Sequence, residues 1–213
     1  MKTAALIMIV SVMAICYTVL YIIEKRNTEP HKLVLTAIMT AMSIAGRFVF
    51  AVIPGFKPVT AITVLAGMYV GAEAGFLCGS LTALISNFYF GQGPFTPFQM
   101  LCWGLTGVFA AILSKPLRRN IIWLTLYGIV AGVAYSLFMD IYTVIWSVSG
   151  WSLSFYLTAI GSAMVFTVEY AVSNVFFLWV LIRPLGRKID HVMRKMDKIE
   201  KDSLLPDKRN VVQ

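Results

Sequence analysis

The chain has 213 residues, of which 59% are hydrophobic and 13% are charged, and its mean hydropathy is +0.79. A soluble domain of this length needs far less apolar surface to build one core, so the surplus must face lipid. The net charge is +8, but the basic residues gather beside apolar stretches, which favours a membrane surface over nucleic acid as their partner.

Apolar stretches recur along the chain, and a bilayer core needs about 20 apolar residues of helix. They are continuous and lack the period-two alternation of barrel strands, so we expect an all-α integral membrane protein. The resulting seven predicted helices lie near residues 3–23, 33–53, 59–72, 74–90, 97–113, 121–147 and 156–182.

Residues 1–26 have some features of a signal peptide, with Lys2 ahead of an apolar run. The run is long, no A-x-A-like cleavage site follows it, and Lys25 and Arg26 come after it. We therefore predict a retained transmembrane helix. This divides the chain into an extra N-terminal helix with its linker (1–32), a six-helix membrane domain (33–185) and a basic cytoplasmic tail (186–213).

The basic residues fall on one side of the predicted membrane topology. Connections on that side hold Lys25, Arg26 and Lys32, then Lys115, Arg118 and Arg119, and finally nine Lys or Arg between Arg183 and Arg209. The other side holds only Lys2 and Lys57. The positive-inside rule predicts a multi-pass protein of the cell membrane with a cytoplasmic C-terminus. In the tail, apolar residues at helical spacing, from Ile189 to Ile199, predict a helix along the inner membrane surface.

Three ionisable residues lie inside predicted spans, where charge is expensive and usually functional: Arg47, Asp140 and Glu169. Arg47 and Asp140 each lie roughly 9 to 10 Å below the outer ends of their helices. They are predicted either to pair with each other or to bind a polar ligand. Glu169 is predicted to be a protonated carboxyl bonded to a neighbouring helix, with a proton site as the alternative.

Two outer connections are rich in Gly and Pro, residues 54–58 and 90–99, and irregular backbone near a membrane commonly lines a cavity. Polar and aromatic residues around them are of the kinds that build small-molecule sites. The predicted substrate-binding residues are Arg47, Phe56, Lys57, Asn87, Gln92, Phe95, Thr96, Gln99, Trp103, Asp140, Tyr142 and Trp146.

On the second predicted helix, Ala37, Ala41 and Ala45 form a stripe of small residues, which allows another helix to approach closely. The stripe is compatible with an internal contact or with docking of a separate membrane subunit.

Neither a catalytic motif nor a metal motif is present. His31 and His191 have no companion ligands nearby in the sequence, and no P-loop occurs. Cys16, Cys78 and Cys102 are spaced irregularly inside predicted helices, as expected of small apolar residues. We therefore predict no enzymatic activity, cofactor or metal, and expect any uphill transport to draw energy from a partner or an ion gradient.

From about Leu33 to Leu185 the chain resembles the substrate-binding membrane subunit (S component) of energy-coupling factor vitamin transporters. The resemblance rests on the alanine stripe, the stretch Arg47–Pro58, the compact helices around Gly67–Gly79 and the segment Phe90–Gln99. It implies a six-helix protein that binds a vitamin or related micronutrient near the outer face. It also implies a membrane coupling subunit, which would contact Ala37, Ala41 and Ala45, and two cytoplasmic ATPases.

The helix at 3–23 departs from that six-helix pattern. The segment Gly91–Pro97 looks most like members linked to cobalamin uptake, with queuosine precursors or other vitamins as alternatives. A stand-alone secondary transporter that uses Glu169 as a proton site, and an accessory subunit without a ligand, are the rival interpretations.

Overall fold

The structure is a computed structural model that describes residues 10–14, 16–18, 21, 25, 29–147 and 151–204, with side chains up to residue 199. Every regular element in these ranges is a helix, which confirms the predicted all-α class. The helices are α2 (Pro30–Val49), α3 (Val59–Tyr69), α4 (Ala72–Phe90), α5 (Thr96–Ile112), α6 (Ser114–Arg119), α7 (Ile121–Trp146) and α8 (Leu153–Leu204).

The predicted helices at 33–53, 59–72, 74–90 and 97–113 correspond to α2, α3, α4 and α5, with ends shifted by a few residues. The predicted helix at 3–23 lies largely outside the described residues. Of those described, Val12 and Cys16 are buried against side chains of α4 and α5. The connection predicted at 115–120 contains the short helix α6, after which the Asn120 side chain caps α7 by accepting a bond from the backbone N–H of Ile122 (2.8 Å).

Three described helices are long and apolar enough to cross a membrane: α2, α7 and the part of α8 from Leu153 to Ile199. Helices α3 and α5 are also apolar but shorter. Large apolar side chains stand exposed on the long helices, among them Val165 on α8, which is 75% exposed, and Val130 on α7, which is 55% exposed. Surfaces of this kind are typical of a membrane-embedded protein, because exposing large apolar areas to water is energetically unfavourable.

Helix α3 forms the centre of the bundle. Its residues from Val59 to Met68 are all buried, because α3 is apolar on every side and packs against α2, α4, α5 and α8. On either side of α4, Gly71 and Gly91 have φ angles of 137° and 105°, which a residue with a side chain rarely adopts. These glycines allow the sharp entry to α4 and the sharp exit into the loop that follows it.

Glycines bring α3, α4 and α5 into backbone contact. A Cβ atom added at Gly67 would lie 2.0 Å from the carbonyl oxygen of Gly107, and one added at Gly107 would lie 2.4 Å from the carbonyl carbon of Gly75. A Cβ at Gly79 would lie 2.5 Å from the backbone of Trp103. Small residues permit such close packing of helices in a bilayer, where dispersion contacts replace the hydrophobic driving force.

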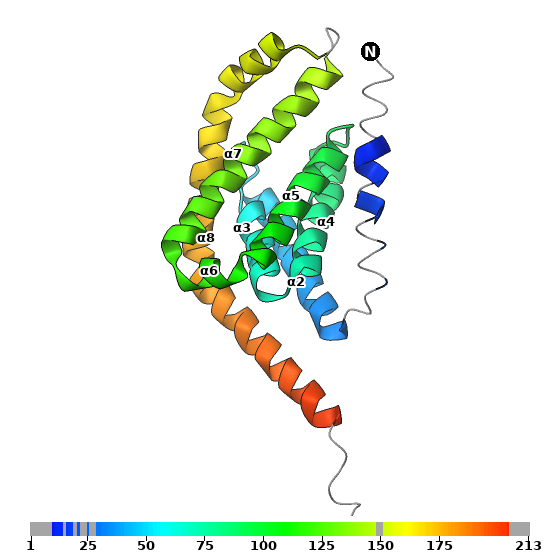
Figure 1. Cartoon of the computed structure of the whole chain (residues 1–213), viewed down its shortest axis with the longest axis vertical. Coiled ribbons are helices and arrows are strands. Elements are labelled where there is room, and N and C mark those ends of the chain that lie inside the picture. Colours follow the sequence, from blue (N-terminus) through cyan, green and yellow to red (C-terminus); the bar gives the residue numbers. More distant parts are fainter. Residues whose placement is uncertain are drawn as a thin grey trace, which may run out of the picture.

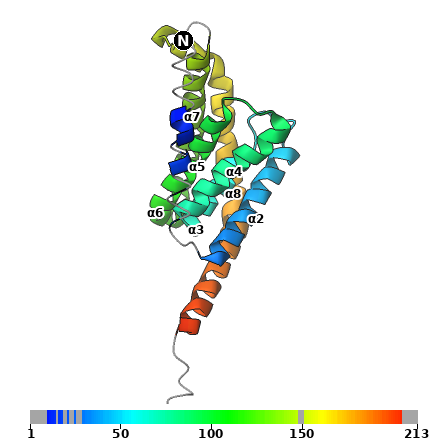
Figure 2. The same ribbon diagram turned by 90° about the vertical axis from the view of Figure 1, so that its right-hand side faces the viewer.

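Helices α7 and α8 run alongside each other, and α8 continues well beyond the bundle (Figure 1). Seen from the side, α2 and α4 lie next to each other and α8 extends below them (Figure 2). The prediction that this helix ends near residue 182 was wrong, because α8 passes through Pro184 without a break. Ile189 and Met193 are buried in a cluster with Met39 and Leu65, so tertiary packing holds the helix together beyond the proline.

Candidate functional site

A polar cavity of about 110 Å³ lies inside the otherwise apolar bundle. It is bounded by the end of α2, the loop before α3, and parts of α3, α5, α7 and α8. Its lining residues are Arg47, Pro54, Gly55, Lys57, Val59, Thr60, Gln99, Trp103, Tyr135, Tyr170 and Asn174. Four of the predicted substrate-binding residues therefore meet here: Arg47, Lys57, Gln99 and Trp103.

Arg47 is the most constrained of these side chains. Buried residues on α2 recur from Thr36 to Ser43 at helical spacing and continue to Arg47, which is only 6% exposed. Its guanidinium donates hydrogen bonds to Ser86 and to Oδ1 of Asn87, the latter at 3.0 Å. It also stacks over Phe90 and Trp103, at 4.8 and 5.1 Å from the ring centroids. Nε is buried and has no hydrogen-bond partner among the described residues.

Asn87 connects the arginine to the start of α5. Its amide nitrogen donates to the hydroxyl of Thr96 (3.0 Å) and to Oε1 of Gln99 (2.8 Å). The Thr96 hydroxyl in turn donates to Gln92 (2.9 Å), and Nε2 of Gln99 donates to the hydroxyl of Tyr135 (3.0 Å). The predicted polar residues of the outer mouth thus form one network that positions the cavity wall.

The loop before α3 is attached to α8. The backbone N–H of Lys57 donates to the Ser173 hydroxyl (2.9 Å), which donates back to the Lys57 carbonyl (3.2 Å). Burial lowers the pKa of the Lys57 ammonium, as does the neighbouring charge of Arg47, and Glu169 opposes this. Glu169 packs against Gly55, where an added Cβ would lie 2.7 Å from its Oε2. The bond from Glu169 to a neighbouring helix that we predicted is not among the described contacts.

Aromatic rings form the walls on the side of α5, α7 and α8. Trp103 stacks on Tyr135 with centroids 5.4 Å apart and an interplanar angle of 7°, and Tyr135 meets Tyr170 edge to face at 5.1 Å. Tyr135, Tyr170 and Asn174 were not predicted as site residues. The sequence signal available for Asn174 was its position as a polar residue in the apolar run of α8. In the structure its amide donates to the Gly128 carbonyl on α7 (3.0 Å).

The predicted ion pair between Arg47 and Asp140 does not form in the described structure. Arg47 faces α4, whereas Oδ2 of Asp140 is buried without a hydrogen-bond partner and Asp140 does not line the cavity. Similar depth along two helices does not specify the direction in which each side chain leaves its helix, and this is why the expected pairing fails. The carboxyl of Asp140 therefore lies apart from the cavity wall that Arg47 and Lys57 form.

Four predicted aromatic site residues lie outside the cavity lining. Phe56 packs against Phe177 with centroids 4.8 Å apart, in an apolar cluster around α3. Phe95, Tyr142 and Trp146 form a line of rings where α5 begins and α7 ends, with centroid distances of 6.4 and 6.1 Å. The line belongs to the predicted outer mouth and does not contribute to the polar cavity.

The residues of the predicted small-residue stripe, Ala37, Ala41 and Ala45, are all exposed on α2.

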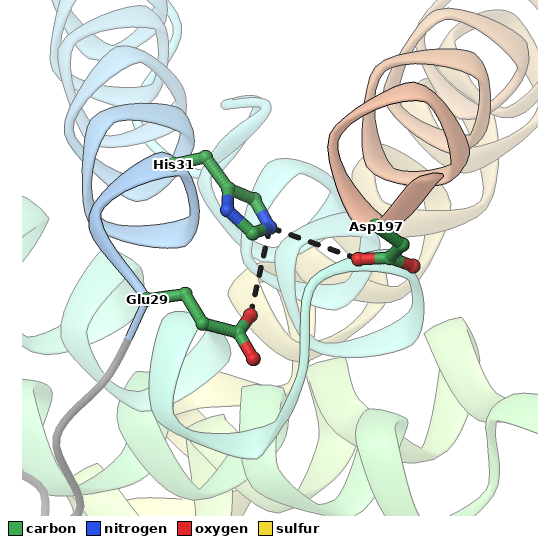
Figure 3. Close-up of side chains that lie close together, drawn as sticks. All are labelled: Glu29, His31 and Asp197. Carbon is green, nitrogen blue, oxygen red and sulfur yellow. Dashed lines mark ion pairs between the residues drawn. The ribbon is translucent and has the colours of Figure 1, made fainter. Parts of the chain in front are cut away.

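A second polar cluster joins the start of α2 to α8 (Figure 3). Nε2 of His31 lies 3.5 Å from Glu29 and 3.8 Å from Asp197. The expectation that His31 has no companion ligands nearby was wrong, because Asp197 is remote in the sequence and the neighbouring Glu29 was not considered. These three residues could each offer one ligand to a metal ion. However, Nζ of Lys32 lies 2.5 Å from Glu29, and its bond and charge lower the pKa of that carboxyl. With one candidate ligand already paired to a cation, the cluster is better explained as an electrostatic contact between two helices.

Replacing Asn87 with alanine is expected to lower the stability of the folded protein by about 1–3 kcal/mol, because the buried guanidinium, Thr96 and Gln99 would each lose a partner. Thermal unfolding in detergent, followed by tryptophan fluorescence, measures the effect. Phe88→Ala is the control, since the Phe88 side chain beside it is 78% exposed. Equal shifts for the two variants would contradict a stabilising role for the network.

No protein-family model matches the chain, and no curated protein or solved structure matches it either. The family resemblance stays a prediction from the sequence, and the chemistry of the cavity has to support or weaken it.

Proposed function

We propose that the chain is the substrate-binding membrane subunit of an energy-coupling factor importer for a vitamin or related micronutrient. In this proposal it crosses the cell membrane several times, keeps its C-terminus in the cytoplasm, and works with a membrane coupling subunit and two cytoplasmic ATPases. The observation that supports it best is the polar cavity between Arg47 and Lys57. A buried cation such as Arg47 is costly inside an apolar bundle, and membrane proteins commonly keep such groups for a ligand.

The lining favours a ligand with a negatively charged group. Arg47 and Lys57 both line the cavity, and the lining includes no Asp or Glu. The hydroxyls of Tyr170 and Thr60 add potential donors around the two cations. A carboxylate or phosphate between them would relieve their mutual repulsion and would accept charge-assisted hydrogen bonds. We infer that the ligand carries such a group.

The volume of the cavity limits how much of a ligand it holds. At about 110 Å³ it is smaller than the roughly 300–1,000 Å³ of a site that encloses a drug-sized molecule. The charged end of a vitamin fits, while the remainder would lie beneath the outer loops. Cobalamin, which is larger than a drug-sized ligand, would require the loop at Pro54–Lys57 to move outward, so a smaller vitamin that carries a carboxylate suits this conformation better. A queuosine precursor would fit by size but lacks the negative group that the lining favours.

The deciding experiment is mass spectrometry of small molecules retained by the full-length protein after purification in detergent. The protein is then incubated separately with cobalamin, queuine, biotin, pantothenate and nicotinate. One vitamin retained at about one molecule per chain would support the proposal. Retention of none of them, either from cells or after addition, would favour an accessory subunit without a ligand.

A proton-coupled secondary transporter is the second candidate, and the position of Glu169 favours it. This carboxyl packs against Gly55, which lines the cavity, so its protonation would alter the field at the adjacent Lys57. Uptake of the retained vitamin into cells separates the two mechanisms. Uptake that survives loss of the ATPase subunits but stops with an uncoupler would replace the importer proposal with this one.

Replacing Ala41 with leucine is expected to prevent co-purification with the coupling subunit and abolish uptake, while ligand binding persists. Ala41 is exposed on α2 in the isolated chain, and a larger side chain there would hold a partner helix away. Co-purification and uptake are measured together with binding to the isolated subunit. Gly161→Leu is a control on α8, where an added Cβ would meet nothing within 4 Å. Normal complex formation by Ala41→Leu would refute the docking role of the stripe.

A further inference from the structure

A groove of about 720 Å³ lies between α5 and α7. Its lining is nearly all apolar, with Leu105 and Phe109 from α5 facing Leu126 and Val130 from α7. At the end next to α6 it reaches Pro116. It lies apart from the polar cavity and shares no lining residue with it.

The two hydroxyl groups in the groove are already satisfied within the protein. The hydroxyl of Tyr127 donates to the backbone carbonyl of Thr106, and the Thr106 hydroxyl donates to the carbonyl of Cys102 (2.8 Å). These hydroxyls therefore offer a polar vitamin no free donor. The groove therefore fits a hydrocarbon chain.

A basic cavity adjoins the α6 end of the groove. It has a volume of about 560 Å³, and it shares Pro116 and Trp123 with the groove. Lys115 and Arg119 line it, both are exposed, and neither forms an ion pair with another described residue. By contrast, Arg118 on the same short helix is paired with Asp190. Two unpaired cations thus stand where an apolar groove opens.

We propose that this composite surface binds one anionic phospholipid. An acyl chain occupies the groove between α5 and α7, and the phosphate lies against Lys115 and Arg119, with Trp123 at the level of the headgroup. The complementary charge identifies the occupant. The positive-inside rule places α6 at the cytoplasmic surface, where anionic headgroups are concentrated. Each nearby Lys or Arg strengthens the binding of such a headgroup. No described residue before α2 lines the groove. The inference requires this membrane orientation and does not depend on the transport proposal.

The test is native mass spectrometry of the full-length protein in detergent with palmitoyl-oleoyl phosphatidylglycerol or the matching phosphatidylcholine. Phosphatidylglycerol is expected to be retained roughly tenfold more strongly, and Lys115→Gln/Arg119→Gln is expected to abolish that preference. Arg187→Gln/Lys195→Gln removes the same charge from exposed positions on α8 and should leave it intact. Equal retention of the two lipids, or the same loss of preference in both double variants, would overturn the proposal.

A second measurement locates the acyl chain. Phosphatidylglycerol with a photoactivatable diazirine on its chain is expected to label peptides of α5 and α7, and Ala134→Phe, at an exposed position in the groove, should reduce this labelling severalfold. If Ala134→Phe proves unstable, the labelled positions on the native chain decide. Labelling elsewhere would show that the groove is empty or belongs to a protein partner. Displacement of the lipid by inorganic phosphate alone would show that the basic cavity binds free phosphate instead. Either result would refute the proposal.

Discussion

Replacing Gly107 with alanine is expected to destabilise the protein strongly, because α4 and α5 meet there backbone to backbone. The added Cβ would lie 2.4 Å from the carbonyl carbon of Gly75, and backbone atoms cannot turn aside as a flexible side chain can. Overpacking typically costs about 1–3 kcal/mol, and we expect the upper part of that range. Helix α5 would have to move away from α4, and the network anchored by Gln99 on α5 would move with it.

Thermal unfolding and size-exclusion chromatography in detergent measure this effect. Gly161→Ala is the matched control, because this glycine also lies inside a helix but has open space around the position of a Cβ. There the better helix propensity of alanine is expected to leave stability unchanged or raise it by up to about 1 kcal/mol. If Gly107→Ala melts at the same temperature as Gly161→Ala, the close approach of α4 and α5 is wrong.

Much of the helical framework was predictable because its cause is local. Continuous apolar runs and the Gly and Pro residues between them placed α2 to α5 and α7 within a few residues. The continuation of α8 was not predictable in this way. Pro184 is a strong local signal for the end of a helix, but Ile189 and Met193 bury their side chains against residues of other helices, and this long-range packing outweighs the local preference.

The arrangement of the candidate site was predicted in part, because only some of its contacts join residues that are close in the sequence. Gln92, Thr96 and Gln99 were correctly grouped with Asn87, because they lie close together in the sequence on either side of a short loop. The predicted partner of Arg47 was wrong, because the prediction of Asp140 relied on opposite charge and similar depth, whereas Arg47 bonds to Asn87. Polar residues at consecutive positions 86 and 87 in the apolar run of α4 were the better signal, because a buried guanidinium needs several acceptors and neutral ones suffice.

Arg47→Gln is expected to weaken binding of a negatively charged ligand by roughly 30-fold or more, because removing one partner of a buried charged contact costs about 2–5 kcal/mol. Glutamine removes the charge but keeps a polar side chain of similar width at this buried position, which limits the damage to the fold. Arg47→Lys keeps the charge but loses the planar guanidinium that reaches Ser86 and Asn87. We expect Arg47→Lys to bind more weakly than the native chain and more strongly than Arg47→Gln.

A comparison of charged and neutral forms of one ligand tests the same prediction without depending on the stability of the variants. A vitamin acid and its neutral counterpart, such as nicotinate and nicotinamide or pantothenate and panthenol, are compared on the native chain, on Arg47→Gln and on Lys57→Gln by isothermal titration calorimetry. The acid is expected to bind more tightly than the neutral compound on the native chain, and both variants should lose that preference. Asp140→Asn serves as the control, since Asp140 does not line the cavity. A preference for the acid that persists in both variants would place the recognised charge elsewhere, because Arg47 and Lys57 are the two cations that line this cavity.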